Sequence, residues 1–308
     1  MMQQPRVNAV ASGVLIVSMA LSVGLLFHID KIRPTAALDN VLYLSSPRAI
    51  KKLSLGYQGL MADIYWTRVV QYYGGVHRAG GGKYELLWPL LNITTHLDPH
   101  LTQAYEFGGS FLSAKPPSGA GLPDKAVELV EYGISQNPND WHLYYDIGFI
   151  YYDQKQYREA AGAFFAGSRL PGAHPFLAVL AARMAEHGGE LETARLLWKT
   201  TYETSKDKDI RSNALTHLRA LQADDDVIQL ERIAENYKQR FGNYPASFLE
   251  VTRAGMLGGI PVDPAGHPYK LAANGKVLVS DPEALPFLEE GLPPGYVSKD
   301  VVESSPAK

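Results

Sequence analysis

Residues of the same kind recur 34 positions apart in the middle of the chain, and this spacing constrains the fold more than any other feature. Three kinds of position recur in this way: Ala126, Ala160 and Ala194; Val130, Phe164 and Trp198; Gly133 and Gly167. A period of roughly 20–50 residues indicates a stack of supersecondary units. In such a stack the small residues let two helices cross closely, and the large ones fill the gap to the next unit. The spacing therefore predicts an array of helical hairpins.

The most complete unit lies in residues 141–174. Its small and large residues follow one order: Tyr144, Ile147, Gly148, Tyr151, Ala160 and Phe164. This order resembles the tetratricopeptide repeat, whose pattern is W-x2-L-G-x2-Y followed by A-x3-F. The resemblance implies about four repeats in residues 59–222, with the two central ones matching best and a capping helix at 209–222. A non-repetitive α-helical domain is the alternative.

Tetratricopeptide proteins bind peptides or protein segments in a concave groove lined by the first helix of each repeat, and the resemblance implies such a groove here. Aligning the units assigns these residues to it: Tyr105, His142, Tyr145, Phe149, Tyr152 and Arg183. Leu112, Asp153, Phe176 and Val179 are expected on the same stripe. Tyrosine suits a protein interface, because its rigid ring ends in a hydrogen-bonding group. The alternative is that an insertion loop or the C-terminal region covers this stripe.

The N-terminal residues predict a membrane anchor. Residues 7–29 contain no Asp, Glu, Lys or Arg, and residues 9–27 form a run of 19 apolar and small side chains. A helix of this length roughly matches a hydrocarbon layer of about 30 Å. The core of a signal peptide is usually shorter and precedes a small-x-small cleavage site, which His28, Ile29 and Asp30 do not provide. We expect a transmembrane helix within residues 1–30 and a juxtamembrane segment at 31–58; a cleaved signal peptide and a buried core helix are the alternatives.

The charges that flank this run do not fix its orientation. Arg6 precedes it, and five basic residues follow it: Lys31, Arg33, Arg48, Lys51 and Lys52. Segment 53–75 resembles the start of membrane-anchored tetratricopeptide proteins of bacteria, which carry a similar GY-x-x-L-x-AD-x-x-W stretch. That resemblance implies no particular chemistry, and we expect Asp63 within it to cap or pair.

The character of the sequence changes after Ala223. A helix is expected at 226–242, followed by Asn243-Tyr244-Pro245, by Asp263-Pro264-x-Gly266-x-Pro268-Tyr269, and by a hairpin that turns at Asn274-Gly275. These motifs resemble the C-terminal region of the major pseudopilins of type II secretion and related type IV pilin-like proteins. The resemblance implies a small α+β domain at 223–282 with an extracytoplasmic location. The motif's tryptophan is replaced by Ala265, and the apolar N-terminal pilin helix is absent, so assembly into a pilus is not expected.

Pseudopilins of this type can hold calcium near this region, and Asp263 and Asp281 are the candidate remnants of such a site. Two carboxylates are few for calcium, which takes six to eight oxygen ligands, so we interpret both as turn caps. The residues after them, 283–308, are rich in Pro, Glu and Ser and predict an extended or disordered tail.

Composition and motifs argue against most kinds of chemistry. The net charge of −3 gives no basic face for nucleic acid, and the absence of cysteine excludes thiolate sites and disulfides. The sequence contains no HExxH, GxSxG or phosphate-loop motif. We interpret the cluster His96-x-Asp98-x-His100 as helix-end capping around Pro99. No catalytic residue, metal, cofactor or small-molecule substrate is therefore predicted, although an enzyme with an unrecognised site remains a third hypothesis.

Together these observations predict a mainly α protein: a transmembrane helix, an α-solenoid of about four tetratricopeptide-like hairpins, and a small α+β pilin-like domain. The expected function is a non-enzymatic, membrane-anchored scaffold that binds a protein partner in its groove. The expected setting is the bacterial inner membrane, with the body in the periplasm, in an assembly of the type IV pilus or type II secretion class. The alternative is a cytoplasm-facing adaptor subunit of a membrane transporter complex.

Overall fold

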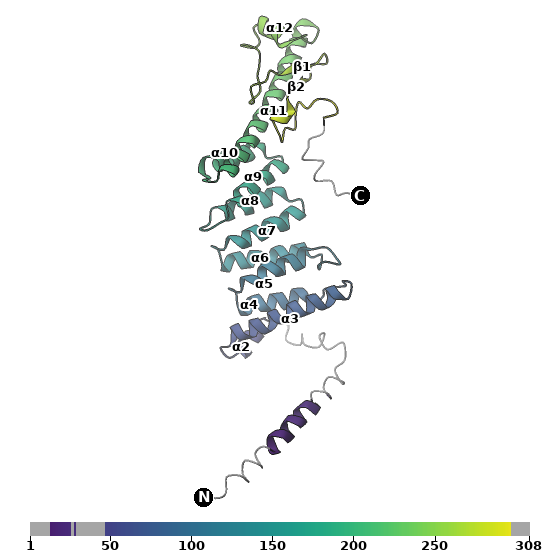
Figure 1. The fold of residues 1–308 in the computed structure, drawn as a ribbon, viewed down its shortest axis with the longest axis vertical. Helices are drawn as coiled ribbons and strands as arrows, with labels where there is room; N and C mark the ends of the chain where they lie inside the picture. The colour runs from purple at the N-terminus through teal and green to yellow at the C-terminus, as the bar shows by residue number, and fades with distance from the viewer. Residues whose placement is uncertain (1–12, 26–27, 29–46, 297–308) are drawn as a thin grey trace. The chain divides into compact units, whose positions relative to one another are not determined.

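The computed structural model describes residues 13–25, 28 and 47–296 (Figure 1). Helices make up most of this part of the chain, which confirms the prediction of a mainly α protein. Residues 13–25 of the expected anchor are helical, whereas residues 9–12 and 26–27 of the same run lie outside the described residues. In the described part of the chain, no helix combines the length and the hydropathy needed to cross a membrane. The anchor therefore stays a prediction.

The chain divides into two compact units. The first contains α2 (Pro47–Leu53), α3 (Gln58–Arg78) and α4 (Leu87–Leu97), together with the loop Pro116–Ala120. Helices α3 and α4 pack as a hairpin around Val69, Leu87 and Leu91, which are fully buried. The loop is held by two tyrosines: the hydroxyl of Tyr73 donates to the carbonyl of Ser118 at 2.7 Å, and that of Tyr84 donates to the carbonyl of Pro117 at 2.8 Å. Hydrogen bonds from two tyrosines thus fix the loop Pro116–Ala120.

The second unit comprises Tyr105–Lys115 and the chain from Gly121 onward. Its helices follow in order: α5 (Thr102–Ser113, which begins in the first unit), α6 (Pro123–Gln136), α7 (Trp141–Asp153), α8 (Tyr157–Ser168), α9 (Phe176–His187), α10 (Leu191–Thr204) and α11 (Lys208–Phe241). Helices α6, α8 and α10 begin at Pro123, Tyr157 and Leu191, which are 34 residues apart. Successive helices from α6 to α11 pack against one another (Figure 1). The sequence period is therefore the period of the helices.

Close contacts between aromatic rings and glycines explain which residues recur. Phe164 of α8 is fully buried against Gly148 of α7, where an added Cβ would lie 2.5 Å from the ring. The ring of Tyr105 on α5 covers Gly133 of α6 in the same manner, at 2.7 Å from an added Cβ. A side chain at either glycine would force the helices apart, because cores at native packing density do not absorb an extra methyl group freely.

Helix α11 continues without a break from Lys208 to Phe241, although the sequence predicts separate helices at 209–222 and 226–242. Its buried side chains change partners along its length. Ala214 and Leu221 belong to the core that α8, α9 and α10 share, whereas Ala223, Val227 and Leu230 belong to a second core with the C-terminal residues. The expected boundary after residue 222 therefore falls inside one helix, at the point where its buried face passes from one core to the other.

The C-terminal core is built from short elements around the end of α11. These are α12 (Phe248–Arg253), β1 (Lys270–Leu271), β2 (Val277–Leu278) and the 3-10 helix η2 (Pro282–Ala284). The strands pair antiparallel, with Lys270 opposite Leu278, and the turn at Asn274-Gly275 is observed as predicted, with φ of 83° at Gly275. This sheet has two strands of two residues each in the described residues, so it is smaller than the sheet expected of a pilin-like domain.

The prediction of an extended or disordered tail from residue 283 onward is wrong for the first half of that segment. Leu285 and Leu288 are buried in the C-terminal core, and the backbone N–H groups of Glu289 and Glu290 donate to the Asp224 carboxylate at 3.0 and 2.7 Å. The prediction was wrong because it relied on the proline-rich composition of the segment and gave no weight to these two leucines. Residues 297–308 of the expected tail lie outside the described residues.

The ring–glycine contact gives a direct test of the hairpin packing. Gly148→Ala should lower the free energy of unfolding by about 2 kcal/mol, because the new methyl group would overlap the Phe164 ring. Gly162→Ala is the matched control: Gly162 lies on α8 with nothing near its Cβ position, so alanine there should stabilise by about 0.5–1 kcal/mol. Chemical denaturation of both variants measures the difference, and equal stability of the Gly148→Ala variant and the parent would contradict this packing.

Candidate functional site

Helix α7 presents an exposed aromatic stripe. Its N-terminus is capped by Asp140, whose carboxylate accepts from the backbone N–H of His142 at 3.1 Å. Leu143, Ile147 and Ile150 are buried on the packed side of the helix. On the other side Tyr145 and Tyr152 keep 38% and 41% of their surface exposed, although each carries a large apolar ring. Two partly exposed rings on one side of a helix are a candidate contact surface.

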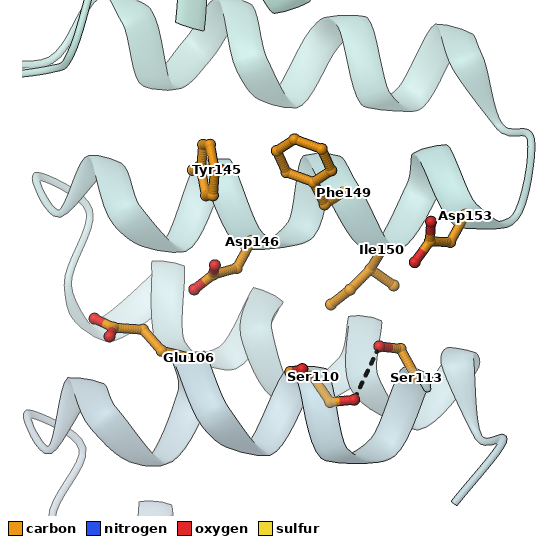
Figure 2. Close-up of a pocket in the computed structure, with 8 residues that line it drawn as sticks. All are labelled: Glu106, Ser110, Ser113, Tyr145, Asp146, Phe149, Ile150 and Asp153. Atoms are coloured by element: carbon orange, nitrogen blue, oxygen red, sulfur yellow. Dashed lines mark hydrogen bonds between the residues drawn. The ribbon is translucent and has the colours of Figure 1, made fainter. Parts of the chain in front are cut away.

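A hollow of about 220 Å³ lies between α5 and α7, beside this stripe (Figure 2). Two helices line it: Glu106, Ser110 and Ser113 come from α5, and Tyr145, Asp146, Phe149, Ile150 and Asp153 come from α7. Figure 2 shows the Asp146 carboxyl group between the two helices, on the side toward Glu106. The lining thus combines three carboxyl groups and two hydroxyls with two aromatic rings, and it contains no basic residue.

Asp146 is the unusual member of the hollow. Burial, and after it the nearby Glu106 carboxylate, raise the pKa of its carboxyl group to about 7, against a lowering effect of His142. Its Oδ2 atom is buried and has no hydrogen-bond partner among the described residues. A carboxylate held in this way lacks a cation or donor to neutralise it. The hollow is therefore suited to a positively charged or hydrogen-bond-donating group.

The structure places the predicted groove residues of α7 and α9 as follows. Phe149 lies between Tyr145 and Tyr152 and is half-buried, because its ring meets Phe164 edge-on at 5.2 Å between centroids. His142 is exposed, with Nδ1 at 2.8 Å from the Asp140 carboxylate and its ring stacked on Trp141.

Farther along the array, Arg183 is exposed on α9. The structure thus brings Tyr145, Phe149 and Tyr152 together as one stripe, with His142 at the start of the same helix. Of the residues expected beside them, Asp153 is exposed and Phe176 is 45% exposed.

The prediction that Tyr105 lines the groove is wrong. Its side chain is fully buried, because its ring covers Gly133 inside the α5–α6 pair. Leu112 of α5 and Val179 of α9, which were expected on the same stripe, are also buried, at 0% and 5% exposure. The face of α5 toward the hollow instead carries Glu106, Ser110 and Ser113, which are spaced by four and three residues as on one helical face.

The sequence analysis missed Glu106 and Asp146, which give the hollow its charge. The orientation of α5 explains why Glu106, and not Tyr105, faces the hollow. Gly109 packs against α6, because an added Cβ there would lie 2.9 Å from Val130. Tyr105 lies four residues before Gly109 and shares its buried face, so the face toward the hollow begins one residue later, at Glu106. Asp146 directly follows Tyr145 and is the one charged side chain in the otherwise apolar and aromatic run 143–152, which is the signal that could have found it.

The other clusters of polar residues serve structural roles. His217 is 3% exposed and stacked between Trp198 and Phe287, at 4.1 and 3.9 Å between ring centroids, so no substrate reaches it. Asp263 accepts from the backbone N–H groups of Ala265 and His267, both at 2.9 Å, as a turn cap does. Asp281 likewise accepts from the backbone N–H of Glu283. No set of three metal-ligating side chains is brought together in the described part of the chain.

The cluster His96-x-Asp98-x-His100 follows the same pattern. The Asp98 carboxylate accepts from the backbone N–H of His100 at 2.9 Å, and the Nδ1 atom of His96 lies 2.8 Å from the carbonyl of Asn92. These are contacts within a helix end, as the sequence analysis expected.

Comparison with protein-family models and with curated protein sequences finds no match to this chain.

The raised pKa of Asp146 makes a prediction about stability and pH. Its folded pKa of about 7 exceeds the value near 3.9 of an unfolded chain, so the folded state binds the proton more tightly. This carboxyl group therefore lowers stability as the pH rises from about 4 to about 7. Asp146→Asn removes the effect and should raise the free energy of unfolding at about pH 8 by on the order of 2 kcal/mol, with the gain shrinking toward about pH 4.

Asp153→Asn is the control, because Asp153 lines the same hollow but is exposed. Its stability should follow that of the parent across the whole pH range, measured by denaturant titration. A gain in the Asp146→Asn variant that is the same at low and high pH would contradict the assignment.

Proposed function

We propose that this protein is a non-enzymatic scaffold that holds a segment of a partner protein against the aromatic stripe and hollow of α5 and α7. The observation that carries the proposal is the pair of exposed rings, Tyr145 and Tyr152, beside a concave hollow with three carboxyl groups. Tyrosine is enriched among the few residues that provide most of the binding energy in protein interfaces. The partner segment we expect is extended and carries a Lys or Arg side chain that enters the hollow beside Asp146.

The setting of the scaffold is proposed on the sequence. The apolar run at residues 9–27 supports attachment to the inner membrane, and the period of α6, α8 and α10 supports a tetratricopeptide-like array. The motifs around Tyr244 and Asp263 support a relation to pilin-like proteins, and with it a periplasmic body in a type IV pilus or type II secretion assembly. In this reading no nucleic acid, cofactor or small-molecule substrate takes part.

A second candidate function is favoured by one observation. The basic residues Lys31, Arg33, Arg48, Lys51 and Lys52 follow the apolar run, and basic flanks tend to stay in the cytoplasm. This favours a body that faces the cytoplasm and serves as an adaptor of a membrane transporter complex. The groove and its chemistry are the same in both functions, and only the topology differs.

The binding role can be tested by site-specific photo-crosslinking. A photoreactive phenylalanine analogue in place of Tyr145, or of Tyr152 in a second variant, should crosslink the full-length protein to a discrete partner in the cells that produce it. Phe165 is the matched control, because it is exposed to 37% on the neighbouring helix α8, against 38% for Tyr145. Equal products from both positions, or none from Tyr145 and Tyr152, would contradict the proposal.

A variant of Asp146 distinguishes an effect on partner binding from an effect on the stability of the fold. Asp146→Asn should abolish or strongly reduce the Tyr145 crosslink although it stabilises the fold, because the partner's cation loses its counter-charge. Asp153→Lys serves as a second variant and should also weaken the crosslink. An unchanged crosslink in both variants would show that the partner segment is not basic.

Reporter fusions decide the topology. A reporter that is active only in the periplasm, fused after Lys308, should give a signal, and a reporter that is active only in the cytoplasm should not. Deletion of residues 9–27 should abolish the periplasmic signal, because this run is the proposed anchor. A cytoplasmic signal alone from the full-length fusion would favour the transporter adaptor.

A further inference from the structure

The first unit exposes an apolar face that its fold does not use. Five large side chains within twelve residues form it: Leu53, Leu55, Tyr57, Leu60 and Ile64, with exposed fractions of 63, 84, 70, 58 and 39%. We call this set the α2–α3 face. The inner side of the same elements is well packed, since Ile50, Ala62 and Val69 are exposed by 3% or less. The α2–α3 face is therefore surplus to the core, and exposed apolar clusters of this kind mark interaction surfaces.

The turn between the two helices holds its apolar residue outward at a conformational cost. Leu55 has a φ of 48°, in the left-handed region that disfavours side chains, and the following Gly56 has a φ of 96°. Hydrogen bonds fix the turn: the backbone N–H of Ser54 donates to Ile50, and that of Tyr57 donates to Ser54, at 2.9 and 2.8 Å. A glycine or asparagine at position 55 would relieve the strain, whereas the chain places there its most exposed large apolar side chain among the described residues.

Charge indicates what covers this face. Residues 47–64 contain three basic side chains, Arg48, Lys51 and Lys52, against a single acidic one, Asp63. Lys51 and Lys52 are exposed at the end of α2, next to Leu53. A second copy of the chain would bring these like charges together across a twofold interface, which disfavours self-association. Basic residues beside leucines and an interfacial tyrosine are typical of a segment that lies on an anionic lipid surface.

The position in the chain places such a surface within reach. Nineteen residues, 28–46, separate the apolar run at 9–27 from Pro47, and 19 residues span at most roughly 65 Å. If that run enters a membrane, the α2–α3 face is covalently confined near the same bilayer. We propose that the α2–α3 face docks on the anionic lipid headgroups of the membrane, with its leucines and Tyr57 in the interface and its lysines on the headgroups. This inference rests on the proposed membrane anchor in one respect only, which is that the anchor brings the lipid surface close to the α2–α3 face.

The absence of cysteine allows a test on the full-length chain, because any introduced cysteine is unique. Three single-cysteine variants carry the same environment-sensitive fluorophore: Leu55→Cys on the face, Val17→Cys in the apolar run, and Leu196→Cys as control. Leu196 lies on α10 and is 64% exposed, which matches the exposure of the face. Each protein is reconstituted in vesicles with and without anionic phosphatidylglycerol, in which doxyl groups on the lipids quench the fluorophore.

The expected result is quenching of the Leu55→Cys label in anionic vesicles, with none for the Leu196→Cys label. Lys51→Glu with Lys52→Glu should weaken this contact by roughly twenty-fivefold, because each lysine near an anionic surface contributes roughly fivefold. Lys115→Glu with Lys206→Glu, two exposed lysines elsewhere, should leave it unchanged.

The outcomes separate this proposal from the anchor itself. Quenching at Val17 without quenching at Leu55 would overturn the lipid contact while the anchor stands. Quenching at Leu55 without quenching at Val17 would support the contact and reject the anchor. A blue shift of the Leu55 label that depends on protein concentration and not on lipid would also overturn the proposal, since a second copy would then cover the face.

Discussion

A ring packed over a glycine sets the distance between paired helices, and the rest of the second unit depends on that distance. Phe164 fills the space above Gly148, and Tyr105 fills the space above Gly133. With a side chain at either glycine, the ring would have no room and the helices would separate. Because the contact fixes both the spacing and the rotation of each pair, it also decides which side chains point away from the core. Tyr145 and Tyr152 lie three residues before and four residues after Gly148, so they flank the glycine on one side of α7, and the Tyr145 ring lies 6.3 Å from the Phe164 ring between centroids.

The sequence predicted the hairpins because the contact leaves a trace at a fixed period. Gly133 and Gly167, and the large residues Val130, Phe164 and Trp198, are separated by 34 residues because the helices that carry them are. The same reasoning failed at Tyr105, where α5 is preceded and followed by irregular spacing. A shift of one residue turns a helix by about 100°, which is enough to move a ring from a groove into a core. Alignment by period is therefore reliable only where both helices of a pair keep the period.

The C-terminal part escaped prediction for a different reason. The sequence analysis divided helix α11 because the character of the sequence changes after Ala223. Asp224 in fact accepts two backbone N–H groups from Glu289 and Glu290, so its polar side chain attaches the last described segment to the helix. Burial raises the pKa of this carboxyl group to about 6, and those hydrogen bonds act against the rise. Partners 65 residues away in sequence leave no local pattern, so only the three-dimensional structure shows them.

Two features of the molecule are not explained by stability, and they lie on different units. Burial without a cation raises the pKa of Asp146, so a fold selected for stability alone would carry a neutral residue at that position. Leu55 combines a left-handed backbone with an exposed side chain, so the same selection would favour glycine there. Local rules of folding are broken most often where a surface has another task. The first exception lies beside exposed aromatic rings in a hollow lined by three carboxyl groups and no basic residue, whereas the second lies beside Lys51 and Lys52 in a stretch with more basic than acidic side chains. Each surface therefore favours a partner of the opposite charge. The hollow of α5 and α7 favours a basic segment, and the turn between α2 and α3 favours an anionic surface.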